Sequence, residues 1–294
     1  MIRTFALALA LLAPGSFCWA QATPPPFAVV ADPAPGAKHP ARLEQVRYPT
    51  GGVAVPARLF VAAGEGVHPT VLLLHGLPGT ELNLDLARAM QRAGWNVMAI
   101  HYRGVWGSPG QFSLTHTVED ARAALAWLRD PVNAAKYGID ASRLVVLGHS
   151  MGGFDTVMLG DDRKVAGFVL VSAADFGGWA PGLETAKGRA EGVAAFADDM
   201  SYTNQTPDQI ADEMLANGRA WAFCASGAKL AGRPVLIVDS DDGNKPGSDA
   251  AAEAIIAGGG PAPARVHFPT DHSFNDHRIA LAAAIVNWLQ ATFP

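Results

Sequence analysis

From residue 70 onward, short apolar runs alternate with stretches that have the periodicity of amphipathic helices. The runs expected to be strands are 70–74, 96–102, 143–147, 165–172, 234–239 and 265–268. The stretches expected to be helices include 82–93, 118–128 and 278–289. Strands that are apolar throughout are typical of a parallel sheet with helices on both faces. The alternation therefore predicts an α/β fold.

Two further β-rich runs precede this alternation. Residues 43–48 and 53–61 flank Thr50-Gly51-Gly52, and a turn sequence between two such runs predicts a hairpin. We expect the folded domain to begin here and to extend over residues 43–294.

The alternation stops between Ser172 and Gly232, a gap far longer than the roughly 2 to 6 residues of an ordinary connection. An insertion over about residues 173–232 is therefore expected. Within it, Thr206 and Pro207 suit the N-cap and first position of a helix that covers 207–216 and ends near Gly218.

The insertion is rich in aromatic residues, and apolar walls with few polar groups are typical of ligand pockets. We expect a helical cap over the functional site, with Trp179, Trp221 and Phe223 binding the substrate. The alternative is that these aromatic residues only fix the insertion to the sheet.

The N-terminal residues have the features of a secretory signal peptide over 1–22: Arg3, the apolar run 5–12, and Ala20-Gln21-Ala22 as a cleavage site. The apolar run is shorter than the roughly 20 residues that cross a bilayer, so no membrane anchoring is expected. Residues 23–42 are rich in proline, alanine and glycine, which predicts an extended leader. We expect an exported protein, periplasmic or extracellular.

The net charge and the cysteine content argue against a nucleic-acid-binding protein and against a disulfide bond within the mature chain. A net charge of −5 provides no basic patch, so nucleic acid is not an expected partner. Removal of a signal peptide that contains Cys18 would leave Cys224 without a partner for a disulfide, and we expect Cys224 to be buried. The sequence gives no indication of oligomeric state.

The strongest chemical signal is Gly148-His-Ser-Met-Gly-Gly153, which directly follows the apolar run 143–147. This strand, turn and helix context is the one that the nucleophile-elbow motif requires. The glycines at 148 and 152 suit a sharp turn that would crowd any Cβ, and the turn would expose the hydroxyl of Ser150.

A serine nucleophile needs a base, usually a histidine that a carboxylate orients. His272 follows the late strand 265–268 in the loop before the last helix, which makes it the best candidate. His277 competes with it, but we expect His277 inside that helix. We expect His75, His101 and His149 to orient backbone. No metal-binding signature such as H-E-x-x-H is present, so neither a metal nor a cofactor is expected.

Three aspartates, Asp239, Asp241 and Asp242, follow the strand 234–239 and could supply the carboxylate. The order serine, acid, histidine along the chain is the order found in α/β-hydrolases, and from about residue 43 to its end the chain resembles that family. The resemblance implies a mostly parallel eight-stranded sheet. In the family a proline often follows the acid, and counting back from Pro246 selects Asp242. Counting forward from the strand leaves Asp241 as an alternative.

The segment His75-Gly-Leu-Pro-Gly79 resembles the H-G-x-x-G loop of the same family, whose donor is usually the residue after the first glycine. The resemblance therefore implies that Leu77 and Met151 supply the backbone N–H groups of an oxyanion hole, because Pro78 has no N–H.

The favoured interpretation is a secreted carboxylesterase-like serine hydrolase that cleaves esters of small or medium acyl groups through an acyl-enzyme. A first alternative is a serine peptidase, because residues 102–129 and the Asp-His-Ser-Phe loop are similar to prolyl-oligopeptidase-type peptidases and dienelactone hydrolases. Such a peptidase would lack the propeller usual in that group. A second alternative is a non-catalytic binding module, because fold does not fix function.

Overall fold

The structure is a computed structural model, and it describes residues 24–34 and 38–294. The expected signal peptide, 1–22, lies outside the described residues. None of the helices that the structure describes is both long enough and apolar enough to span a membrane.

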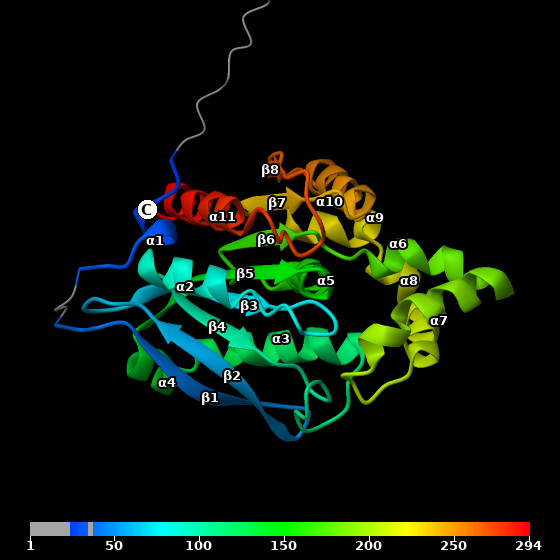
Figure 1. Ribbon diagram of the computed structural model, residues 1–294, viewed down its shortest axis with the longest axis horizontal. Helices are drawn as coiled ribbons and strands as arrows, with labels where there is room; N and C mark the ends of the chain where they lie inside the picture. Colours follow the sequence, from blue (N-terminus) through cyan, green and yellow to red (C-terminus); the bar gives the residue numbers. More distant parts are fainter. Residues whose placement is uncertain (1–23, 35–37) are drawn as a thin grey trace, which may run out of the picture.

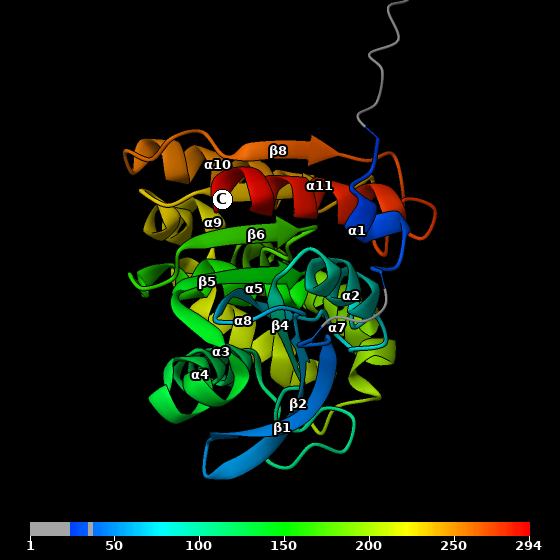
Figure 2. The same ribbon diagram turned by 90° about the vertical axis from the view of Figure 1, so that its left-hand side faces the viewer.

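A single eight-stranded sheet forms the centre of the molecule, in the order β1-β2-β4-β3-β5-β6-β7-β8. The strands are β1 (Arg42–Thr50), β2 (Val53–Val61), β3 (His68–Leu74), β4 (Asn96–Ile100), β5 (Ile139–His149), β6 (Gly167–Val171), β7 (Val235–Asp239) and β8 (Ala264–His267). β1 and β2 form the expected antiparallel hairpin, β2 pairs antiparallel with β4, and all other pairs are parallel. Figure 2 shows the strands following one another from β8 at the top to β1 at the bottom. The predicted fold class is confirmed.

Helices cover both faces of this sheet (Figure 1). They are α2 (Leu84–Arg92), α3 (Leu114–Arg129), α4 (Pro131–Tyr137), α5 (Met151–Met158), α10 (Lys245–Ala257) and α11 (Arg278–Thr292). Helices α4 and α10 were not among the expected helices.

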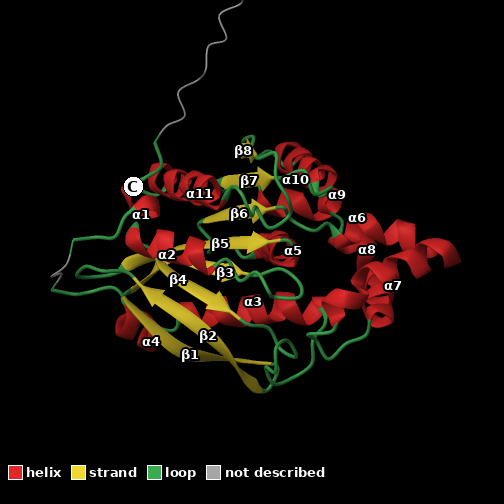
Figure 3. Cartoon of the chain, viewed as in Figure 1, coloured by secondary structure: helices red, strands yellow, loops and turns green. Residues whose placement is uncertain are grey.

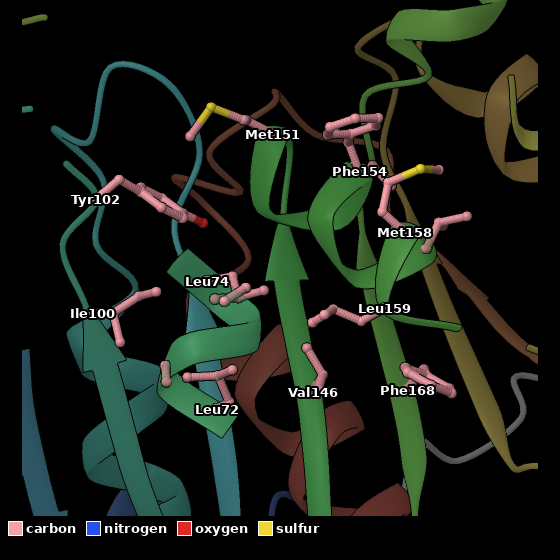
Figure 4. Packing of buried hydrophobic residues seen from close by; sticks show 14 of the residues in the cluster. Leu72, Leu74, Ile100, Tyr102, Val146, Met151, Phe154, Met158, Leu159 and Phe168 are labelled. Carbon is pink, nitrogen blue, oxygen red and sulfur yellow. The ribbon is translucent and has the colours of Figure 1, made fainter. Parts of the chain in front are cut away.

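The buried strands are apolar throughout because both of their faces are covered. In β3, Leu72 and Leu74 belong to the core cluster shared with α3 and α5, whereas Val71 and Leu73 belong to the cluster shared with α2 and α11. Figure 4 shows the first cluster, in which side chains of α5 lie against the sheet. The period-2 geometry of a strand thus distributes its residues to two separate cores.

The leader differs from the extended segment that its composition predicts. Residues Phe27–Val30 form a short helix, α1, which packs against α2 and α11. Arg92 donates from Nε to the carbonyl oxygen of Ala28 at 2.5 Å. The four residues Phe-Ala-Val-Val are apolar and lack proline, so this part of the leader can pack where its proline-rich neighbours cannot.

The segment between β6 and β7 is helical, and its long helices lie at one end of the molecule (Figures 1 and 3). It contains α6 (Phe176–Trp179), α7 (Ala186–Met200), α8 (Pro207–Trp221) and α9 (Phe223–Ser226), with 3₁₀ turns at Ala180–Glu184 and Gly227–Leu230. We refer to residues 173–232 as the cap.

Helix α8 begins as expected, with Thr206 as N-cap in a capping box with Gln209 and with Pro207 in its first turn. It does not end near Gly218 but continues to Trp221. A Cβ at position 218 would lie 2.5 Å from the Cβ of Ala180, so this glycine serves helix packing and not helix termination.

The cap is also tied to the loop that follows β4. The side-chain amide of Asn204 accepts from the N–H of Phe112 at 2.9 Å and donates to the carbonyl oxygen of Gly110 at 2.8 Å. Trp106 stacks on Tyr202 with ring centroids 4.3 Å apart. These contacts fix the cap relative to the sheet.

Candidate active site

Ser150 lies at the junction between β5 and α5, where its backbone has a φ of 56°. This left-handed conformation is rare for residues other than glycine and is retained only where the surroundings hold it. The N–H of Ser150 donates to the carbonyl oxygen of Val171 at 3.0 Å, and its own carbonyl oxygen accepts from Ala174 at 3.0 Å. The Ser150 side chain does not cap α5, so the hydroxyl is not used by the helix.

The glycines around Ser150 are required by close backbone approaches. A Cβ on Gly148 would collide with the carbonyl oxygen of Gly152, and a Cβ on Gly152 would collide with that of Leu74. A Cβ on Gly76 would lie 2.8 Å from the Cβ of Ser150, so the 75–79 loop lies directly against the serine.

His272 and Asp242 form a close pair, with Nδ1 of His272 2.5 Å from Oδ2 of Asp242. Asn244 supports the carboxylate by donating its backbone N–H to Oδ1 at 2.9 Å and its side-chain amide to Oδ2 at 3.2 Å. Burial raises the pKa of Asp242, but the hydrogen bonds from His272 and Asn244 outweigh it and lower the pKa to about 2. Asp242 is therefore ionised at neutral pH.

The other two candidate acids point elsewhere. Asp239 belongs to β7 and pairs with Arg265, its Oδ2 lying 2.7 Å from Nη2. Asp241 is exposed and lies 3.1 Å from Nε2 of His267. Of the three aspartates, Asp242 is the one that contacts His272.

His149 fixes the loop that carries His272. Its Nε2 lies 2.9 Å from the carbonyl oxygen of His272, and because a carbonyl can only accept, Nε2 carries the proton. The two imidazole rings lie with centroids 4.7 Å apart. Burial, reinforced by the charge of His272, lowers the pKa of His149 to about 3, so the ring is neutral.

The 75–79 loop presents the N–H of Leu77 toward the same region. Nδ1 of His75 donates to the carbonyl oxygen of Gly76 at 2.7 Å, and a trans peptide places its N–H on the side opposite its C=O. Within residues 24–34 and 38–294, neither the N–H of Leu77 nor that of Met151 donates to a backbone or side-chain acceptor. Neither donor is thus used in a hydrogen bond within the described residues, and of the two only Leu77 lines the cavity described next.

A cavity of about 410 Å³ joins these groups. Ser150, His272, Asp242 and Leu77 all line it, together with cap residues. Four of the expected site residues are therefore brought together, from segments that are up to 195 positions apart for Leu77 and His272. Met151, expected as the second oxyanion donor, is buried and is not among the residues that line the cavity.

Only one of the three aromatic residues expected to bind substrate lines this cavity. Trp179 does so, whereas Phe223 is completely buried in the core and Trp221 packs edge-to-face on Phe154 at 5.1 Å. Trp221 and Phe223 therefore follow the alternative stated in the sequence analysis, in which the aromatic residues only fix the insertion to the sheet. Phe176 and Phe196 line the cavity instead, and composition alone does not distinguish them from the others.

Three further expectations concern single residues. His277 does not lie inside α11 but is its N-cap, with Nδ1 2.8 Å from Oδ1 of Asp276. His101 does not bond backbone through its ring but lies 2.9 Å from Nη1 of Arg58. Cys224 is exposed, not buried, because the short helix α9 turns the neighbouring Phe223 into the core.

No group of three or more potential metal ligands is found among the described residues.

A buried polar network lies next to the site. Asp155 on α5 accepts from the hydroxyl of Thr117 at 2.7 Å, and the nearby Tyr102 donates to the carbonyl oxygen of His75 at 3.3 Å. Burial, more than the charge of Asp120, raises the pKa of Asp155 to about 8 despite the hydrogen bonds that it accepts. Asp155 is therefore mostly protonated at pH 7.

Comparisons with known proteins agree with this geometry. The sequence profile of the Alpha/beta hydrolase family matches residues 71–284. Esterase EstD of Thermotoga maritima is 26% identical over 130 residues, which are 40% of this chain and 30% of that protein. The alpha/beta hydrolase domain-containing protein WAV2 of Arabidopsis thaliana is 37% identical over 106 residues, which are 35% of this chain and 33% of that protein. The match thus spans about a third of the length of each curated relative.

Solved structures show the same fold over most of the chain. An esterase of Pyrobaculum calidifontis superposes with a TM-score of 0.62 and 21% sequence identity, covering 87% of each chain. At this identity the likeness shows the fold alone.

Proposed function

The chain belongs to the alpha/beta hydrolase family, and we propose that it is a serine carboxylesterase that cleaves esters of small or medium acyl groups. One observation carries the proposal: Ser150, at a strained turn, lines the same cavity as the hydrogen-bonded pair His272 and Asp242. The name of Esterase EstD, which matches part of this chain, supports the choice of an ester substrate.

In the proposed first step, the Ser150 hydroxyl oxygen attacks the carbonyl carbon of the ester while its proton passes to Nε2 of His272. Asp242 holds the ring by its Nδ1–H and stabilises the imidazolium. The tetrahedral intermediate then expels the alcohol, which takes the proton from Nε2 as its C–O bond breaks. Water repeats the sequence on the acyl-enzyme, releasing the acid and restoring the serine.

Negative charge develops on the carbonyl oxygen in both steps. The N–H groups of Leu77 and Met151 are proposed to bind it, and the start of α5 adds the positive end of a helix dipole. His75 positions the first of these donors through its bond to Gly76. Loss of one such donor typically lowers the rate about 10² to 10³ fold.

Export belongs to the same proposal and rests on the basic start, apolar run and Ala20-Gln-Ala22 of the sequence. N-terminal sequencing of the protein recovered from outside the cytoplasm of an expressing bacterium tests it. A mature N-terminus at residue 23 supports export, and an intact Met1 in the cytoplasm contradicts it.

A fluorophosphonate probe tests the function directly because it reports an activated serine without any guess at substrate. We expect a mass adduct on the wild type and none on Ser150→Ala. The rates of hydrolysis of a series of esters are then compared with that of a peptide amide of the same acyl group. Faster cleavage of the esters indicates an esterase, and faster cleavage of the amide indicates a peptidase. An unlabelled wild type, under conditions that label a known serine hydrolase, would contradict the proposal and favour a binding module.

A further inference from the structure

The cavity next to Ser150 has an unbalanced charge. Three carboxylates line it, those of Glu81, Asp199 and Asp242, while no lysine or arginine is among its lining residues. Asp242 is paired with His272. The other two carboxylates are not needed for the proposed acyl transfer, so their charge requires another explanation.

Asp199 is the less compensated of these two. The Oε1 atom of Glu81 accepts the backbone N–H of Asn83 at 2.6 Å and lies 4.0 Å from Nη2 of Arg278. The side chain of Asp199 has no hydrogen bond or ion pair with any residue that the structure describes. It lies in the last turn of α7 and is partly buried. Burial and the charge of Asp198 raise the pKa of Asp199, and the charge of His272 only partly offsets this.

The surroundings of Asp199 are aromatic. Phe196, one helical turn earlier on α7, lines the cavity with Phe176 and Trp179 of α6. Phe176 lies between the other two, with ring centroids 5.4 Å from Trp179 and 6.3 Å from Phe196. Trp179 as a whole is 40% exposed, so a ligand can reach this residue.

A carboxylate without an ion pair, in the same cavity as an accessible aromatic side chain, is a setting that favours organic cations. The rings attract a cation through their quadrupoles, and the carboxylate adds a direct charge interaction. The same arrangement disfavours substrates that carry a carboxylate or phosphate, because their charge would meet Asp199 and Glu81 without a basic residue to compensate.

We propose that this esterase selects esters that carry an ammonium group, and that Asp199 and Trp179 determine the selectivity. This inference rests on the proposed function. The cation would lie against the cap while the ester carbonyl lies at Ser150, so the cap supplies specificity and the sheet supplies the reacting groups.

Matched neutral and cationic esters test the proposal. Butyrylcholine and 3,3-dimethylbutyl butyrate differ by nitrogen for carbon in the alcohol. Ethyl trimethylglycinate and ethyl 3,3-dimethylbutanoate make the same exchange in the acyl part, and the two arms show which side of the ester carries the cation. The measured quantity is the ratio of kcat/KM for the cationic ester to that for the neutral one.

The adjacent residue Asp198 provides the matched control, since it is exposed on the same helix and does not line the cavity. We expect Asp199→Asn to lower the cation preference about tenfold and Trp179→Leu to lower it about two- to fivefold, in at least one arm. Asp198→Asn should retain the wild-type ratio. The two esters differ in intrinsic reactivity, but this difference is the same for every variant. It therefore cancels when the kcat/KM ratio of a variant is compared with that of the wild type.

The outcomes separate this inference from the proposed function. If the wild type is labelled by fluorophosphonate and cleaves neutral esters, but Asp199→Asn leaves both ratios unchanged, the inference is wrong and the function stands. An equal loss on both esters would also overturn it, since Asp199 would then act through His272. If the wild type is neither labelled nor active on any ester, the proposed function itself fails.

Discussion

Nε2 of His149 lies 2.9 Å from the carbonyl oxygen of His272, so the residue before the serine holds the backbone of the proposed base. The two segments are 123 positions apart in the chain. Because burial lowers the pKa of His149 to about 3, its ring is neutral at pH 7, and its Nε2–H can donate to this carbonyl oxygen. Residue 149 is thus a positioning residue for the loop that follows β8.

Replacing His149 by phenylalanine should retain a buried ring and remove this bond. We expect kcat to fall about tenfold with little change in KM, because a small displacement of the base affects the reaction more than substrate binding. Steady-state kinetics check this, and circular dichroism verifies folding. A change confined to KM would contradict the positioning role.

The choice of acid can be tested by exchanging each aspartate for asparagine. Asp242→Asn should lower kcat about 10⁴ fold, because the neutral amide cannot stabilise the charge of the imidazolium and its NH2 group can donate to Nδ1, which favours the wrong tautomer of His272. Asp241→Asn should have an activity close to that of the wild type, since Asp241 is exposed and pairs with His267. A larger loss in Asp241→Asn than in Asp242→Asn would reverse the assignment.

Replacing Trp179 should mainly lower the activity, whereas replacing Phe223 should mainly lower the stability of the fold. Trp179→Ala removes a cavity wall, so we expect kcat/KM to fall about tenfold with little loss of stability. Phe223→Ala leaves a hole in the core and should lower the free energy of unfolding by about 3 to 5 kcal/mol. Chemical denaturation and kinetics on the folded protein distinguish the two effects. Equal losses of unfolding free energy in the two variants would contradict the assignment of Trp179 to the cavity wall and of Phe223 to the core.

Three buried groups predict how stability depends on pH. Burial lowers the pKa of His75 to about 4 and that of His149 to about 3, so from these values up to about 6.5 the unfolded chain binds more protons and stability rises with pH. Asp155, with a pKa of about 8, holds its proton in the folded state from pH 3.8 upward, which lowers stability as pH rises. Together they place maximum stability near pH 6.5, because only the opposing effect of Asp155 remains above it.

The variant Asp155→Asn isolates one of these contributions. Denaturation between pH 6.5 and 8 should show a decline of up to about 1.4 kcal/mol per pH unit in the wild type and a flatter dependence in the variant. A decline that persists unchanged in Asp155→Asn would show that Asp155 is already ionised in the folded protein.

Much of the sheet could be predicted from the sequence because the inner strands β4, β6 and β7 are buried along their whole length and are therefore almost entirely apolar. The outer strands differ, since β1 alternates exposed and buried residues and β8 is largely exposed. The runs 70–74 and 143–147 lie inside β3 and β5, and both strands extend beyond these runs, since β3 begins at His68 and β5 covers Ile139–His149. Helix α7 was not predicted, because Gly188, Gly192 and its small residues weaken the amphipathic pattern. Its N-cap, Thr185, which accepts from the N–H of Gly188 at 3.0 Å, is the signal that could have located it.

The residues of the proposed acyl transfer could be located because each follows a strand at the same edge of the sheet. The substrate-binding residues could not, because the sequence does not show which face of a cap helix turns inward. Phe223 and Cys224 are neighbours with opposite exposures, and Phe196 and Asp199 become functional candidates only once α7 is placed over Ser150. Specificity is thus encoded in tertiary packing and the reacting groups in local motifs.

Helices α1 and α11 pack together at the end of the molecule opposite the cap (Figures 1 and 2). Residue 294 lies at this end, directly after α11. An enzyme attached to a bead or electrode through this residue would therefore direct its cavity toward the solution. Attachment at residue 294 would thus leave the cap exposed to the solution.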